Sequence, residues 1–138
     1  MTRNLSEDQF GYRAGHQPAG PDYGAPMHDL GDMMPDYYDR PKLYRSYNSF
    51  DPESENVILG SRGKPDTPAT IYRAVPEGVE AINPGDWVTT SPSYAKQHLT
   101  GVLNGKGHIL QGSATAGELY SEGNSIHEWG WHPRREGT

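Results

Sequence analysis

The sequence predicts an α+β domain with two small packed sheets, antiparallel or mixed, few short helices, and an irregular arm at its N-terminus. The chain of 138 residues holds 17 Gly and 12 Pro, which interrupt long periodic segments and exclude a helical bundle. Only 33% of the residues are hydrophobic. An average globular chain has about 45–50%, so the core must be small. The length fits one domain, and regular signals begin only after residue 50.

Residues 1–50 form the predicted arm. They are rich in Gly, Pro, Tyr and Asp, have almost no aliphatic residues, and show no sustained period of 2 or 3.6 residues. This pattern is typical of irregular structure or disorder. The segment is nevertheless rich in tyrosine, whereas disordered tails are usually poor in aromatic residues. We therefore expect an arm packed on a domain of residues 51–138 rather than a free tail.

Capping signals predict two short helices. The run Asp-Pro-Glu at 51–53 supplies a capping side chain, a proline at the first helical position and an acid near the positive helix end. This helix should end near Gly60. The run Ser-Pro at 91–92 begins the second helix, which Asn-Gly at 104–105 should end.

Four short strands follow from β-branched and aromatic residues, at positions 69–75, 87–90, 108–114 and 125–131. In the first strand, Ile71, Arg73 and Val75 should share one face. In the last strand, alternation places Glu128 at the centre on the same face as Ile126, with the tryptophans on the other face. The three tryptophans are expected in the core, because a chain poor in aliphatic residues needs aromatic burial.

Several kinds of site and partner are disfavoured. The chain has no cysteine, and it contains neither GxGxxG nor GxxxxGKS/T. His127 and His132 resemble a zinc-protease pair but lie five residues apart around two Trp and a Gly, so we expect no metal. The net charge of −6 disfavours a non-specific grip on nucleic acid. No signal peptide or transmembrane segment is apparent, so we expect no membrane partner and a cytoplasmic location.

Three polar positions on separate predicted strands remain as candidates for chemistry. Arg73 lies inside an apolar strand, Thr89-Thr90-Ser91 closes the next, and Glu128 lies in the last. A charged residue in the middle of a strand is costly unless it is paired or faces a cleft. Taken singly, each position also has an ordinary structural explanation. Arg73 would keep its aliphatic stem on the apolar surface and its charged head in water. The threonines would reflect β-propensity, Ser91 would cap the next helix, and Glu128 would be exposed to solvent. The histidines at 16, 28, 98, 108 and 132 have no partner spacing and are interpreted as surface residues.

Three short segments contain these positions, in the order IYRA at 71–74, WVTTS at 87–91 and IHEWGWHP at 126–133. Together they resemble the Arg, Ser-Thr-Ser and Glu signature of NAD-dependent mono-ADP-ribosyltransferases of the bacterial-toxin type. The span 71–133 is similar to domains of phage head-associated and toxin-like polypeptides. The stretch GYRAGHQPAGPDYGAPMHDL in the arm also resembles a segment of the phage-type domains.

The resemblance implies catalytic roles for three residues. Glu128 would grip a ribose hydroxyl and stabilise the oxocarbenium-like state formed as nicotinamide leaves. Arg73 would bind a phosphate of NAD or the nicotinamide ribose. Thr89, which stands where the family usually has Ser, would hold Glu128 by a hydroxyl hydrogen bond.

Four further residues would complete the NAD site. The backbone of Ala74 would take the nicotinamide carboxamide, and Thr90 and Ser91 would build the edge of the cleft. Tyr94 would either stack on nicotinamide or belong to the core. Arg13, His16 and Asp29 in the arm are open candidates for completing the cleft.

The residue type that would accept ADP-ribose is not predicted, because the sequence departs from the family at one position. Members that modify arginine or asparagine usually carry Glu or Gln two residues before the catalytic Glu, but this chain has Ile126. Glu122 in the preceding loop is a candidate substrate-activating acid.

We expect an NAD-dependent transferase of phage or toxin type, acting in the producing or the target cell on a macromolecule, preferably a protein. Alternatives are a catalytically silent binding module of the same fold and a transferase acting on nucleic acid.

Overall fold

The computed structural model describes residues 19–22, 24–31, 33–44, 51–123 and 125–133. Within these residues it has two α-helices and two small antiparallel sheets, which confirms the predicted α+β class. The helices are α2 (Asp51–Ser61) and α3 (Pro92–Gly101). The larger sheet has the order β1-β5-β6-β3, and the smaller sheet pairs β2 with β4. Their bounds are β1 Ala25–Pro26, β2 Pro68–Val75, β3 Trp87–Val88, β4 His108–Thr115, β5 Leu119–Ser121 and β6 Trp129–Trp131. Two 3₁₀ turns, Pro41–Tyr44 and Ala116–Glu118, complete the described elements.

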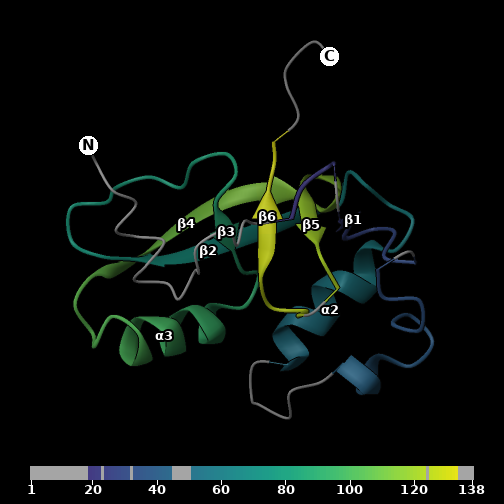
Figure 1. The fold of residues 1–138 in the computed structure, drawn as a ribbon, viewed down its shortest axis with the longest axis horizontal. Coiled ribbons are helices and arrows are strands. Elements are labelled where there is room, and N and C mark those ends of the chain that lie inside the picture. Colours follow the sequence, from purple (N-terminus) through teal and green to yellow (C-terminus); the bar gives the residue numbers. More distant parts are fainter. Residues whose placement is uncertain (1–18, 23, 32, 45–50, 124, 134–138) are drawn as a thin grey trace.

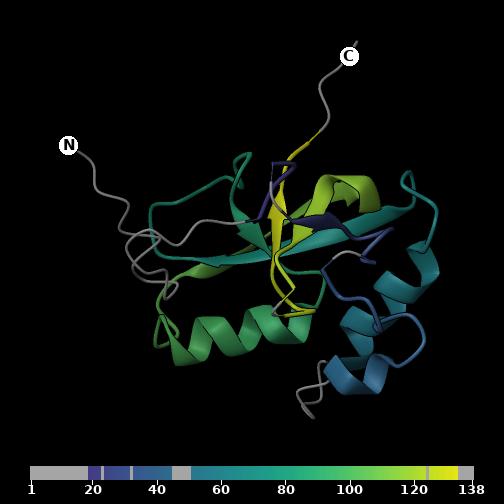
Figure 2. The same ribbon diagram turned by 45° about the vertical axis from the view of Figure 1, so that its right-hand side comes forward.

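The two sheets meet where β2 passes the end of β3. The N–H of Tyr72 donates to the carbonyl of Thr89 at 2.8 Å, and the N–H of Thr89 donates to the carbonyl of Tyr72 at 2.9 Å. Both helices lie on the same side of the strands, with α3 beneath β2 and β4 (Figures 1 and 2). This junction brings segments near residues 73, 89 and 128 toward the start of α3.

The helices begin where capping chemistry predicts. Helix α2 starts at Asp51, and the hydroxyl of Ser91 accepts from the N–H of Tyr94 at 3.0 Å at the start of α3. Helix α3 ends at Gly101, before the Asn-Gly pair at 104–105. Both residues of that pair have positive φ, and the N–H of Gly105 donates to the carbonyl of Leu99 at 2.9 Å. The pair therefore closes the turn after the helix instead of forming its last residues.

The strand predicted over 125–131 is wrong in its first half. Only Trp129–Trp131 pairs as a strand, and Glu128 lies just before it. The segment bends because the indole N–H of Trp129 donates to the carbonyl of Ile126 at 3.1 Å and the N–H of His127 donates to the hydroxyl of Ser125 at 3.0 Å. Ile126 and His127 are both buried, so the predicted separation of these two residues onto a core face and an opposite face does not hold here.

The other predicted strands are present with changed bounds. β2 and β4 match the predictions closely, and Ile71, Arg73 and Val75 are all buried on one face. The strand predicted over 87–90 is shorter, Trp87–Val88, followed by the bridge at Thr89. β1 and β5 were not predicted, since two or three residues give no periodic signal.

The principal core includes side chains from the segment interpreted as an arm. Met27, Leu30, Met34 and Tyr37 are fully buried there, together with side chains from α2 and both sheets. Ala25 pairs with Ser121 in the larger sheet. The described part of residues 19–44 is thus built into the domain rather than laid on its surface. Trp129 is in this core and Trp131 packs against it, whereas the buried Trp87 lines a pocket described next.

Candidate functional site

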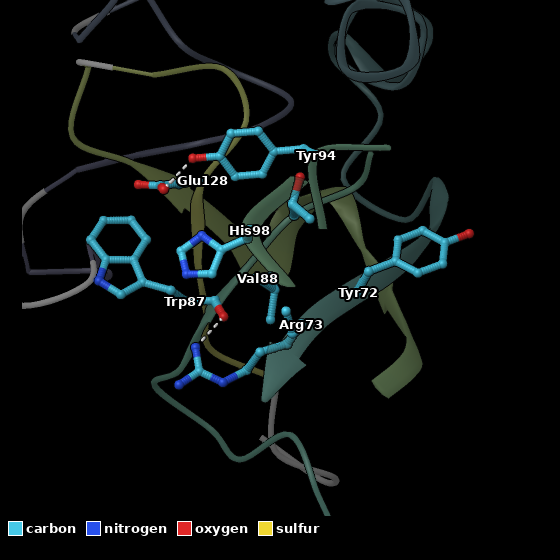
Figure 3. A pocket seen from close by; sticks show the side chains of 9 residues that line it. Tyr72, Arg73, Trp87, Val88, Tyr94, His98 and Glu128 are labelled. Atoms are coloured by element: carbon cyan, nitrogen blue, oxygen red, sulfur yellow. Dashed lines mark hydrogen bonds between the residues drawn. The ribbon is translucent and has the colours of Figure 1, made fainter. Parts of the chain in front are cut away.

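A pocket lies where the sheet junction faces α3. It is open to solvent, and its empty space of about 340 Å³ includes part of that solvent. Its lining residues are Tyr72, Arg73, Ala74, Trp87, Val88, Thr89, Tyr94, His98 and Glu128. Five of the seven predicted site residues therefore meet here: Arg73, Ala74, Thr89, Tyr94 and Glu128 (Figure 3). The two others, Thr90 and Ser91, are buried and are not among the lining residues.

Arg73 supplies a desolvated cation on one side of the pocket. Its side chain is 6% exposed, and Nη1 donates to the carbonyl of Trp87 at 2.7 Å. Its Nε lies 3.6 Å from a carboxylate oxygen of Asp86. Strand β2 presents the guanidinium at the sheet junction, where these contacts fix its orientation. A planar cation held in this way can bind phosphate or a ligand hydroxyl.

Glu128 supplies the carboxylate on the other side, and its hydrogen-bond partner differs from the predicted one. The hydroxyl of Tyr94 donates to Oε2 of Glu128 (Figure 3). The hydroxyl of Thr89 instead accepts from the N–H of Ser91 at 3.1 Å. Thr89 closes the turn into α3 by this contact, since a short polar side chain bonds readily to the backbone two residues on. Among the described contacts, Tyr94 rather than Thr89 holds Glu128.

A buried polar cluster fixes the residue next to Glu128. Nδ1 of His127 lies 2.7 Å from the hydroxyl of Ser54, and Nε2 lies 3.0 Å from a carboxylate oxygen of Asp51. Burial lowers the pKa of His127, against the opposing effect of Asp51. A neutral ring whose Nε2–H donates to Asp51 and whose Nδ1 accepts from Ser54 satisfies these contacts. The Tyr94 ring stacks on this imidazole at 5.2 Å between centroids, with 21° between planes.

Helix α2 also holds the start of α3. Oε1 of Glu53 accepts from the hydroxyl of Ser91 at 2.6 Å and from the N–H of Ser93 at 3.0 Å, while Oε2 accepts from the hydroxyl of Ser93 at 2.8 Å. Burial alone would raise the pKa of Glu53, but these hydrogen bonds, with Lys96 nearby, lower it overall. The first turn of α2 thereby sets the position of α3 and of the residues α3 contributes to the pocket.

His98 is a pocket residue that sequence reasoning missed. It was interpreted as a surface residue, yet its imidazole lies between Glu128 and Arg73 beside Trp87 (Figure 3). Burial lowers the pKa of His98, with Glu128 opposing this effect and Arg73 adding to it. The available signal was helical spacing, because a residue four positions after Tyr94 shares its helix face.

The remaining candidates lie elsewhere. Ile126 is 1% exposed, and neither Glu122 nor the exposed Asp29 is among the pocket-lining residues. Arg13 and His16 lie outside the described residues. In the described part of the chain, no three His, Asp or Glu side chains are grouped in a way that could hold a metal ion. No helix found there is long and apolar enough to cross a membrane.

No protein-family model, curated protein or solved structure matches the chain. Function is therefore inferred from the residues of the pocket and the contacts that position them.

Proposed function

We propose that the protein is an NAD-dependent mono-ADP-ribosyltransferase. It cleaves the bond between nicotinamide and ribose at this pocket and transfers ADP-ribose to a macromolecule, preferably a protein. One observation carries the proposal: a buried arginine from β2 and a hydrogen-bonded carboxylate before β6 face one pocket whose wall includes Thr89. These are the three positions that the sequence resemblance selected.

The chemistry of the pocket fits this reaction. Nicotinamide departure leaves positive charge on the ribose, and a carboxylate held in place stabilises that charge without reorganising. Glu128 is held in this way by the Tyr94 hydroxyl. Arg73 provides the complementary charge for a phosphate, and Trp87 provides an aromatic wall.

The first test compares Glu128→Ala with Glu77→Ala, a control at an exposed acid. Labelled NAD is incubated with the protein and a lysate of the producing or target cell. The release of nicotinamide and the appearance of labelled protein bands on a gel are measured. We expect Glu128→Ala to lower release by about 10²–10³-fold, because it removes only transition-state stabilisation. NAD should still raise the melting temperature of the variant, since a ligand bound to the folded state stabilises it.

Two outcomes contradict the proposal. Unchanged release by Glu128→Ala would remove the carboxylate from the mechanism. A wild-type protein whose melting temperature rises with NAD, but which releases no nicotinamide with any lysate, would instead be a silent binding module of the same fold.

A further inference from the structure

The imidazole of His98 is the group in the pocket to which the proposed reaction has so far given no role. It comes from α3, one turn after Tyr94, and the two rings lie 6.5 Å apart between centroids. It lies between the Glu128 carboxylate and the Arg73 guanidinium (Figure 3), and it senses the charge of both. A ribose gripped by Glu128 and a phosphate bound by Arg73 would therefore place reacting atoms close to this ring.

The surroundings of His98 favour its uncharged form near neutral pH. Burial is the largest influence on its pKa and lowers it; Glu128, from the segment before β6, raises it, and Arg73, from β2, lowers it. On its own helix the ring faces Tyr94. A neutral imidazole can accept a proton.

Among the described residues that line the pocket, Glu128 is the one carboxylate, so none of the others could activate a nitrogen acceptor as a second carboxylate would. Ile126 occupies the position two residues before Glu128 and is buried, and Glu122 is not among the lining residues. A neutral imidazole cannot deprotonate a guanidinium, whose pKa exceeds about 12. It is well suited to an O–H group, which becomes strongly acidic only as its oxygen bonds to the ribose carbon.

We propose, resting on the proposed transferase function, that His98 is a general base for an oxygen nucleophile, either water or the hydroxyl of an acceptor. The bond between the nicotinamide nitrogen and ribose C1′ breaks, and its electron pair leaves on nicotinamide, which becomes neutral. An oxygen lone pair forms the new bond to C1′, and the O–H proton passes to His98 and then to solvent. Water yields ADP-ribose, and an alcohol yields its O-linked ADP-riboside.

The test uses the full chain, NAD, and two probes: water alone, then water with added methanol. The wild type should release nicotinamide in water and form methyl ADP-ribose when methanol is present. His98→Gln should slow both reactions by about 10²-fold at neutral pH, the lower range for loss of a general base. His108→Gln, a control on β4 away from the pocket, should retain the wild-type rate.

The pH profile separates a base from a structural residue. Because burial lowers the pKa of His98, the wild-type rate should fall as pH drops through a value below the ordinary 6.5. In His98→Gln this fall in rate, which the imidazole causes, should be absent. The variant should still show the rise in melting temperature with NAD.

Equal rates and equal pH limbs in the wild type and His98→Gln would overturn the role of His98. A wild-type rate that does not fall at any pH below 6.5 at which the protein stays folded would overturn it even if the variant failed to fold. Failure of the proposed function looks different, since the wild type would then release no nicotinamide with any acceptor, whether or not NAD raises its melting temperature.

Discussion

At the scale of single residues, Tyr94 links the carboxylate of Glu128 to the interior. Its hydroxyl donates to Glu128, its ring stacks on His127, and its backbone N–H is capped by Ser91. His127 is in turn held by Asp51 and Ser54. Because one face of the Tyr94 ring is covered by His127, its clearest contribution to the pocket is to orient Glu128.

Tyr94→Phe isolates that contribution, because it deletes the hydroxyl and keeps the stacked ring. A hydrogen bond to a charged group is worth about 1.5–3 kcal/mol, so kcat for nicotinamide release should fall by about 10–100-fold. The KM for NAD should change little, since Arg73 is untouched. Tyr120→Phe on β5, whose ring packs edge-on against His132 outside the pocket, is the matched control. Equal kcat in Tyr94→Phe and the wild type would show that the hydroxyl does not orient Glu128.

The sequence predicts some of these residues and misses others for physical reasons. Arg73 and Glu128 are detectable because a charge flanked by buried residues needs a partner or a cleft. The hydrogen-bond partner of Thr89 cannot be detected from the sequence, because the direction of its hydroxyl depends on the conformation of the turn into α3. His98 was missed since helical spacing from Tyr94 becomes informative only when the helix face toward the pocket is known.

At the scale of elements, the first turn of α2 positions both halves of the site. Asp51 binds His127 next to Glu128, and Glu53 binds the N-terminus of α3, which carries Tyr94 and His98. The acidic start of α2 was predicted as ordinary capping of its own helix. Its second use, as a cap for a helix forty residues later, is a tertiary contact and has no local sequence signal.

Glu53→Gln tests this link between the helices. The glutamine amide has one acceptor oxygen in place of the two of the carboxylate, and it carries no charge. The free energy of unfolding at neutral pH should therefore fall by about 1–3 kcal/mol. Because hydrogen bonds lower the pKa of Glu53 below 4.5, the wild-type advantage is fully present above that pH. It disappears as pH falls through the folded-state pKa.

Urea unfolding at neutral pH and at about pH 3 measures both effects. Glu80→Gln, at an exposed acid in the loop after β2, is the control and should stay within about 0.5 kcal/mol of the wild type. A Glu53→Gln midpoint equal to that of the control at neutral pH would mean that Glu53 does not stabilise α3.

At the scale of the whole molecule, the small core expected from composition is completed by the N-terminal segment. Met27, Leu30, Met34 and Tyr37 are fully buried, and each such side chain contributes about 1.5–3 kcal/mol. Their sum, roughly 6–12 kcal/mol, is comparable to the whole stability of a domain, about 5–15 kcal/mol. Sequence reasoning expected this segment to pack but could not place it in the core, since its buried residues follow no regular period.

Two leucines of this segment provide a matched test of that role. Leu30 is fully buried, whereas Leu43 is 58% exposed. Leu30→Ala should lower the free energy of unfolding by about 2–5 kcal/mol, because it leaves a cavity in the principal core. Leu43→Ala should change it by less than about 0.5 kcal/mol. Urea unfolding followed by tryptophan fluorescence reports both, because Trp129 lies in the same core as Leu30. Equal midpoints for the two variants would show that the segment is not part of the core that supports the pocket.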